Sequence, residues 1–217
     1  VQAVLAIASL QMLNALRAFS TGESQWSKGQ KDATYALSHY ATTGDAKAYD
    51  QFHKGLRVPI SDMLARKLLE TEGDKARMQA SLLLQGGNEP DAIQDLIWIT
   101  TYFKRSHLIE ELLQKWRDSD EGVLQLQALG AEIHASVRNG PLTQEQHDSW
   151  LARINAIQAQ LTDAQQDFSE TLVESSRTLK SWLWWINIGG ALGMLALLMW
   201  HTSRLQRDTE QAEDALD

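Results

Sequence analysis

The chain has 217 residues, with 28 acidic and 20 basic side chains, a net charge of −8 and no cysteine. The acidic balance argues against nucleic acid as a partner, because phosphates are bound by basic patches. Without cysteine there is no disulfide, no thiolate nucleophile and no cysteine-ligated zinc. Since the chain begins at Val1 rather than Met and ends inside a helical pattern, we expect it to be part of a longer product.

The first segment, residues 1–16, carries no charge (VQAVLAIASLQMLNAL). It is too short to span a bilayer by itself. We interpret it as the end of a first transmembrane helix that leaves the bilayer at Arg17. An ordinary buried first helix is the alternative.

Helical periodicity dominates residues 17–181. The first helix is predicted to end before Gly44, a left-handed C-cap, and Asp45 is predicted to cap a second helix over 46–85. That helix contains Pro59, which we expect to kink it. Two glycines in GGNEPD (86–91) end it, and Asn88 is predicted to cap a third helix near 91–105.

A heptad pattern predicts a fourth helix from near His107 to Asn139. Its seam is Ile109, Leu112, Trp116, Ser119, Val123, Leu126, Gly130, Ile133 and Val137. Thr143 and Gln146 form a capping box that opens the longest helix. No Gly or Pro interrupts that helix before Lys180, so we expect it to continue into the next apolar stretch without a hinge.

Residues 182–200 are 19 residues without a charge, a length of roughly 28 Å as a helix. Tryptophans stand at both ends, where their rings suit the two lipid–water interfaces. We therefore predict a transmembrane helix. Gly189 and Gly193, one turn apart, predict close packing in a dimer, although glycine is also common in membrane helices.

Residues 201–217 show Leu205, Thr209, Ala212 and Leu216 at heptad spacing, which predicts the start of a cytoplasmic coiled coil. The phase of this pattern does not continue that of Gly189 and Gly193. We hypothesise that the mismatch allows two packings of a dimer. Basic residues flank both ends of 182–200 equally, so the cytoplasmic placement rests on the coiled coil and not on charge.

We find no P-loop, GxSxG or HExxH pattern, and predict no catalytic residue, no metal and no cofactor in the segment. Aromatic residues with arginines are the best candidate for a pocket that binds a carboxylate or an amine. The candidate ligand-binding residues are Trp98, Tyr102, Arg105, Trp116 and Arg117; core aromatics with solvated arginines are the alternative. Arg57 and Arg66, beside Pro59, are a weaker candidate for an anion.

The run from Tyr35 to Asp45 (YALSHYATTGD), followed by AYDQF at 48–52, resembles the Y-x-x-T-G-D-x-x-x-Y-x-x-F/Y turn of bacterial extracytoplasmic helical sensors, including CHASE-type and helical bimodular domains. Residues 86–138, with GGNEPD and KWRDSD, are similar to sensors of membrane-bound diguanylate cyclases and histidine kinases. The resemblance implies a homodimer that senses a signal outside and controls a cytoplasmic enzyme; a small-molecule ligand is a possible partner. The chain is shorter than a full bimodular sensor, and no family ligand residue carries over.

The sequence thus predicts an all-α protein: an elongated bundle of four or five helices over 17–181, continuous with a transmembrane helix. We expect a sensory segment of a bacterial inner-membrane receptor, with residues 17–181 in the periplasm. The output domain would be a GGDEF-type diguanylate cyclase or a histidine kinase. A membrane-anchored scaffold without enzymatic output is the alternative, and an enzyme within these 217 residues is the weakest option.

Overall fold

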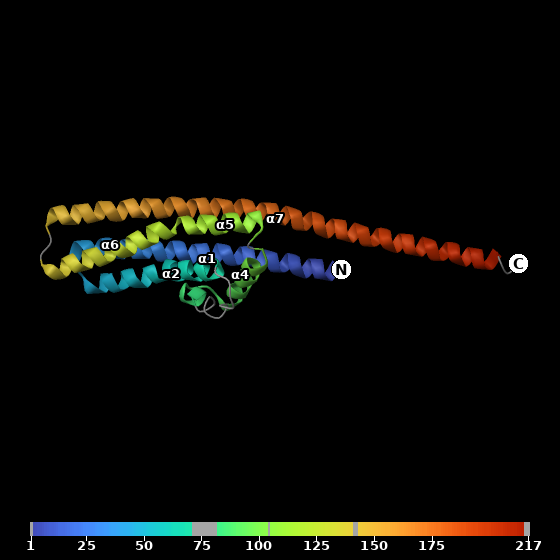
Figure 1. The fold of residues 1–217 in the computed structure, drawn as a ribbon, viewed down its shortest axis with the longest axis horizontal. Helices are drawn as coiled ribbons and strands as arrows, with labels where there is room; N and C mark the ends of the chain where they lie inside the picture. Colours follow the sequence, from blue (N-terminus) through green and yellow to red (C-terminus); the bar gives the residue numbers. More distant parts are fainter. Residues whose placement is uncertain (1, 71–81, 104, 141–142, 215–217) are drawn as a thin grey trace. The chain divides into compact units, whose positions relative to one another are not determined.

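The computed structural model describes residues 2–70, 82–103, 105–140 and 143–214, and side chains within them except those of 69–70, 205 and 207–214. Every regular element in these ranges is an α-helix, which confirms the all-α prediction (Figure 1). The helices are α1 (Gln2–Thr43), α2 (Ala46–Glu70), α4 (Pro90–Phe103), α5 (His107–Asp118), α6 (Asp120–Asn139) and α7 (Gln144–Asp214). As predicted, α7 is one helix with no break between the heptad pattern and the apolar stretch.

The chain forms two compact units, which we describe separately. The bundle unit is Asn14–Ser175, and the apolar unit combines Val1–Leu13 with Ser176–Asp217. The core of the bundle unit is built from α1, α2, α6 and α7. Each of the four contributes side chains without solvent exposure, among them Leu37, Phe52, Ile133 and Ile154. Burying one such side chain stabilises the fold by about 1.5–3 kcal/mol.

The predicted helix ends at 43–45 and 143–146 are confirmed. Gly44 has φ 66°, and its N–H donates to the carbonyl of Tyr40 at 2.8 Å. The Asp45 carboxylate accepts from the N–H of Lys47 at 3.0 Å, which satisfies one of the free donors at the start of α2. Thr143 N–H donates to Gln146 Oε1 at 2.9 Å, and Gln146 N–H donates to Thr143 Oγ1 at 3.3 Å.

Aromatic residues hold the turn between α1 and α2 against α6. The Tyr40 hydroxyl shares a hydrogen bond with His134 Nδ1 at 2.7 Å, and Tyr49 stacks on the His134 ring at 4.1 Å between centroids. Phe52 lies beneath the backbone of Gly130, where a Cβ would meet its ring at 2.4 Å. The residues that carry the sensor-like motif therefore have a packing role in the bundle unit.

The prediction of a single helix over 107–139 is wrong at Ser119. The chain ends α5 at Asp118 and starts α6 at Asp120. The Ser119 N–H bonds to the carbonyls of Trp116 and Arg117, and its hydroxyl donates to the Trp116 carbonyl at 2.8 Å. Serine competes for backbone acceptors in this way, which favours helix ends over helix interiors. The seam itself is confirmed as apolar packing, since Ile109, Leu112, Val123, Leu126 and Ile133 are all buried.

The second helix was expected over 46–85, and the described structure follows it to Glu70, with residues 82–85 again helical. The rest of that prediction lies outside the described residues. Pro59 lies inside α2 and is buried. Near it, α1 and α2 approach closely: a Cβ on Gly55 would stand 2.6 Å from the backbone nitrogen of Ala33 and 2.8 Å from the carbonyl oxygen of Gly29.

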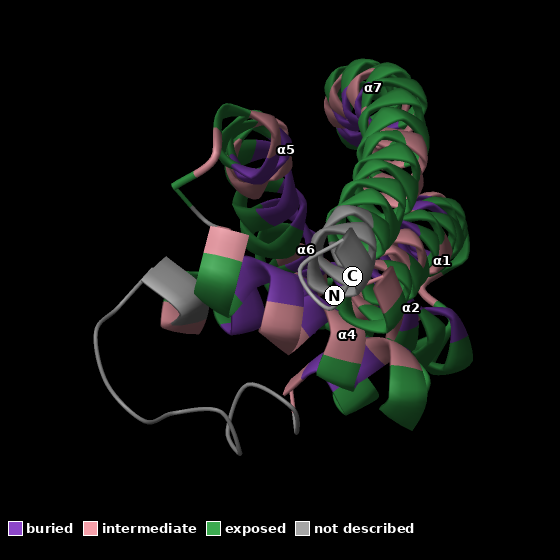
Figure 2. Ribbon diagram, turned by 90° about the vertical axis from the view of Figure 1, so that its right-hand side faces the viewer, coloured by how far each residue is buried: buried purple, intermediate pink, exposed green. Residues whose placement is uncertain are grey.

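The apolar unit contains the first turns of α1 and the last part of α7. Both helices are long and apolar enough to cross a membrane, with mean hydropathies of 1.4 and 1.6 over their most apolar stretches. Trp182 and Trp200 are 66% and 60% exposed, and much of α7 is coloured as exposed in Figure 2. A continuous apolar surface of this kind indicates association with a membrane.

Within the apolar unit, polar side chains join α1 and α7. Gln2 Nε2 donates to the carbonyl of Asn187 at 3.1 Å, and Asn187 Nδ2 donates to Ser9 Oγ at 2.9 Å. Gly190 faces α1, since a Cβ there would lie 3.1 Å from Leu5 Cδ1. A Cβ on Gly189 or Gly193 would meet no described atom within 4 Å, so the predicted glycine pair lies on the free side of α7.

We predict that Gly55→Ala lowers the free energy of unfolding by about 1–3 kcal/mol. The added methyl group collides with backbone of α1, which cannot rotate away as a side chain can. The intrinsic gain of alanine over glycine in a helix, about 1 kcal/mol, offsets only part of this cost. Urea denaturation followed by circular dichroism measures the change. Lys54→Ala, at the exposed neighbouring position, is the control, and equal stability of the two variants would contradict the close approach.

Candidate ligand-binding cavity

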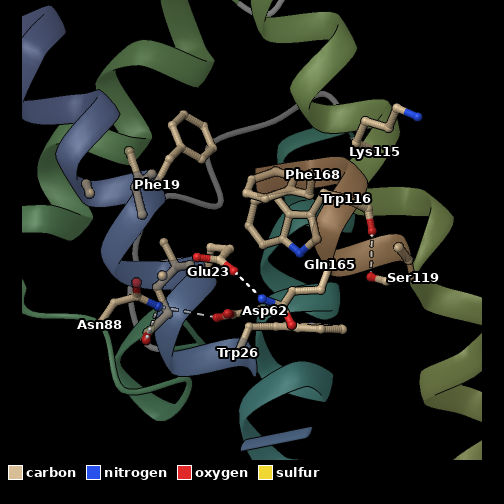
Figure 3. A pocket seen from close by; sticks show the side chains of 15 residues that line it. Phe19, Glu23, Trp26, Asp62, Asn88, Lys115, Trp116, Ser119, Gln165 and Phe168 are labelled. Carbon is tan, nitrogen blue, oxygen red and sulfur yellow. Dashed lines mark hydrogen bonds between the residues drawn. The ribbon is translucent and has the colours of Figure 1, made fainter. Parts of the chain in front are cut away.

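A cavity of about 40 Å³ lies inside the bundle unit, where α1, α2, α4, α5 and α7 meet (Figure 3). The space is therefore small, on the scale of a few water molecules. Its lining divides into an aromatic part, Phe19, Trp26, Trp116 and Phe168, and a polar part, Glu23, Asp62, Asn88 and Gln165. A small apolar space with a few convergent polar groups is the usual form of a binding site.

The aromatic part joins three helices. Phe19 and Trp26 come from the same face of α1, two turns apart, and are 3% and 6% exposed. Trp116, from the last turn of α5, meets Phe19 edge to face with 6.5 Å between ring centroids. Phe168 of α7 also lines the cavity (Figure 3). Aromatic pairs in this geometry contribute roughly 0.5–1.5 kcal/mol beyond their buried area, so the walls of the cavity are also part of the core.

Asp62 is the most unusual side chain of the polar part. It is 2% exposed, and burial raises the pKa of its carboxyl well above the ordinary value. A hydrogen bond from Asn88 Nδ2, at 3.3 Å, lowers that pKa but acts more weakly than the burial. Within the described part of the chain no cation pairs with this carboxyl. A buried carboxyl without a cation is costly when charged and therefore tends to hold a proton.

Asn88 comes from the turn between residues 85 and 90, which packs against Asp62. Gly87 has φ 89°, and a Cβ on Gly86 would collide with Asp62 Oδ1 at 2.2 Å. Asn88 Nδ2 also donates to the carbonyl of Leu83 at 3.0 Å. The prediction that Asn88 caps the third helix is therefore wrong: its side chain is taken by two acceptors inside the bundle, and α4 starts at Pro90 without it.

The Asn88 amide leaves one acceptor unused. Both partners of Nδ2 are acceptors, so the orientation of the amide is fixed with Oδ1 turned toward Gly22 of α1. This oxygen is buried and has no hydrogen-bond partner in the described structure. Buried polar atoms are nearly always satisfied, and an exception needs an explanation such as a bound molecule.

Glu23 and Gln165 connect α1 to α7 at the cavity. Gln165 Nε2 donates to Glu23 Oε1 at 2.8 Å, and Gln165 Oε1 accepts from Ser27 Oγ at 2.9 Å. The dashed line between Glu23 and Gln165 in Figure 3 marks the first of these bonds. The carboxylate of Glu23 thus reaches the cavity with its charge uncompensated by a basic partner in the described residues.

The basic residues close to the cavity are engaged elsewhere. Arg66, one turn after Asp62 in α2, is 1% exposed and forms an ion pair with Asp120 at the start of α6. Lys115 pairs with Asp167 of α7 at 3.1 Å, and Figure 3 shows its amine directed away from the rings. The suggested anion site at Arg57 and Arg66 finds Arg66 already paired with a carboxylate and Arg57 exposed.

The five residues predicted to bind a ligand lie in different places. Trp98 and Tyr102 are on α4, with ring centroids 6.1 Å apart, and Tyr102 is exposed. Arg105 follows α4 and is exposed. Arg117 forms an ion pair with Glu110 at 3.0 Å. Trp116 is the member of this group that lines the cavity.

Sequence reasoning missed Asp62, Asn88, Glu23 and Gln165. A pattern was present in α2: Gly55, Pro59, Asp62 and Arg66 recur at helical spacing, and all four are buried. This face of α2 carries two small or rigid residues, followed by an acidic and a basic residue. The pattern could have indicated that polar side chains are buried inside the bundle. Glu23 and Gln165 are 142 positions apart, and no local pattern connects them.

Comparisons of the chain with protein-family models, with curated proteins and with solved structures found no match. Among the described residues, no group of three or more His, Cys, Asp and Glu side chains is arranged to hold a metal ion.

We predict that Asp62→Asn flattens the pH dependence of stability. The folded protein keeps the Asp62 proton at pH values where the unfolded chain, with a pKa near 3.8, has released it. The native state then binds more protons than the unfolded state, so the free energy of unfolding falls as pH rises from about 4 through the folded pKa, by at most about 1.4 kcal/mol per pH unit. The variant lacks this slope, which urea titrations across the range will measure.

Asp50→Asn, an exposed position of the same helix, serves as the control and should keep the wild-type slope. A wild-type slope in Asp62→Asn would show that Asp62 is charged in the folded protein at neutral pH.

Proposed function

We propose that the chain is the sensory input and transmembrane signalling segment of a bacterial membrane receptor. Residues 17–181 would form a periplasmic sensor, 182–200 a span of the inner membrane, and 201–217 the start of a cytoplasmic coiled coil. The output would be a diguanylate cyclase of the GGDEF type or a histidine kinase. The segment itself would carry no catalytic step.

One observation supports this proposal most directly. A single helix, α7, contributes Ala164, Gln165 and Phe168 to the cavity and continues as helix through the apolar stretch 182–200. A molecule that enters the cavity must act on the packing of α7, because that helix forms one of its walls. Interiors are close-packed and respond to such changes by shifting between arrangements. A continuous helix passes a rotation or a translation along its length.

The apolar unit supports the membrane part of the proposal. Its large apolar side chains are exposed on α7, including the tryptophans at both ends of the stretch. The Gln2–Asn187–Ser9 hydrogen bonds hold two apolar helices together on one side. Gly189 and Gly193 remain open on the other side, where a second copy could approach closely.

We predict that two copies cross-link through the open side of α7. The chain has no cysteine, so each introduced cysteine is the only thiol in the chain that can form a disulfide. In membranes, Ile186→Cys and Ala196→Cys lie on the face of Gly189 and Gly193 and should form disulfides between copies at least tenfold faster than Ile188→Cys, which faces Ser9 and Leu13 of α1. Equal rates at all three positions would argue against a dimer contact at the glycine pair.

We further predict that filling the cavity changes this cross-linking. Ala164→Met places a larger side chain in the cavity, as a bound molecule would, and should alter the disulfide rate at Ala196→Cys several-fold in the full-length protein. Ala152→Met, at an exposed position of the same helix, should not. Identical rates in all variants would contradict signalling through α7 and favour the membrane-anchored scaffold.

A further inference from the structure

Three of the polar groups that line the cavity are acceptors of hydrogen bonds. Asp62 and Glu23 bring carboxyl groups, and the buried Oδ1 of Asn88 is an acceptor without a donor. Two amide donors beside these acceptors are already used: Asn88 Nδ2 serves Asp62 and Leu83, and Gln165 Nε2 serves Glu23. A ligand that complements this set must supply donors and carry positive charge.

The aromatic part favours the same class of ligand. Four aromatic side chains from α1, α5 and α7 line the space, and the electron-rich faces of indole and phenyl rings attract cations. An anion would meet two carboxyl groups in a buried space, and the ion pairs of Arg66 and Lys115 leave neither as its obvious partner. A neutral apolar molecule would leave the Asn88 acceptor unsatisfied.

The size of the cavity limits the ligand further. A space of about 40 Å³ favours a ligand of few non-hydrogen atoms. Short primary or methylated ammonium ions have this size.

We propose that the cavity binds a small organic ammonium ion, with its nitrogen between the carboxyl groups of Asp62 and Glu23 and its carbon atoms against Phe19, Trp26, Trp116 and Phe168. This inference names the class of ligand that the proposed sensor would bind. Its biological role rests on the proposed function, whereas the binding itself does not.

Binding to a protonated Asp62 releases that proton to solvent and leaves an ammonium–carboxylate pair. The other ionisable groups facing the space are Glu23 from α1 and Lys115 from α5, with the Arg66–Asp120 pair adjacent in α2 and α6.

The test compares three probes of similar size and different charge on the full chain in detergent or nanodiscs: ethylammonium, ethanol and acetate, at constant ionic strength. Ligand-observed NMR measures the dissociation constants. For three non-hydrogen atoms the best expected value is about 1 mM. We expect ethylammonium to bind at least tenfold more tightly than ethanol or acetate, and tetraethylammonium, which exceeds the cavity, not to bind.

Two substitutions locate the site. Asp62→Asn keeps the shape and still accepts from Asn88, and should weaken ethylammonium at least tenfold. Glu23→Gln keeps an acceptor for Gln165 and should weaken it several-fold. Asp95→Asn, a partly buried carboxyl of α4 that does not line the cavity, should change the dissociation constant less than twofold.

The proton provides an independent readout. Calorimetry of ethylammonium binding in buffers of different ionisation enthalpy, at pH values from about 4 upward, should reveal proton release on binding in the wild type wherever Asp62 is protonated, and a smaller release in Asp62→Asn.

Three results would overturn the proposal. Equal binding of ethanol would show a simple apolar cavity, and a preference for acetate would show an anion site. No binding of any probe would show a cavity filled by water. Unchanged affinity in Asp62→Asn would also overturn the proposal. The Ala164→Met cross-linking experiment uses no ligand and therefore tests signalling through α7 separately. The ammonium proposal can be overturned while that signalling is confirmed, and the signalling can be overturned while ammonium binding is confirmed.

Discussion

The bundle unit depends on the burial of Arg66, whose guanidinium must keep an anion because it is almost fully removed from water. Taking one partner from a buried ion pair costs roughly 3–5 kcal/mol, so Asp120 is held close to α2. Asp120 lies in the first turn of α6, where the helix dipole also favours a carboxylate. The break at Ser119 therefore has a structural purpose: it gives α6 an N-terminus at the position where Arg66 needs its partner. The same pairing leaves Asp62, one turn earlier in α2, beside the cavity without that cation.

The sequence predicted those features that local chemistry determines. Gly44, Asp45, Thr143 and Gln146 act within four residues of their partners, and each forms the turn or cap expected of it. The apolar seam through Leu112 and Leu126 was also visible, because periodicity depends only on spacing. Asn88 was misjudged because its role is decided by a distant group: it binds Asp62, 26 positions away, in preference to capping the next helix. The cavity could not be predicted for the same reason, since its walls come from five helices.

The glycines of α7 show what spacing can and cannot determine. The G-x-x-x-G pattern identified Gly189 and Gly193 as a pair on one face, but not which neighbour that face meets. In the apolar unit Gly190, outside the pair, is the glycine against α1, with Asn187 forming hydrogen bonds on the same side. The sequence-based hypothesis about two coiled-coil phases concerns Leu205 to Leu216, whose side chains lie outside the described residues.

The uninterrupted course of α7 also constrains how this protein can change in evolution. An insertion of one residue between Phe168 and Trp182 turns everything after it by about 100° about the helix axis, since a turn holds about 3.6 residues. Insertions or deletions of about seven or eleven residues restore the phase almost completely. Homologues of different length should therefore differ in this segment by such steps, and insertions or deletions of a single residue should be rare there. The length of the segment between Phe168 and Trp182, rather than its amino-acid composition, would then be conserved among homologues.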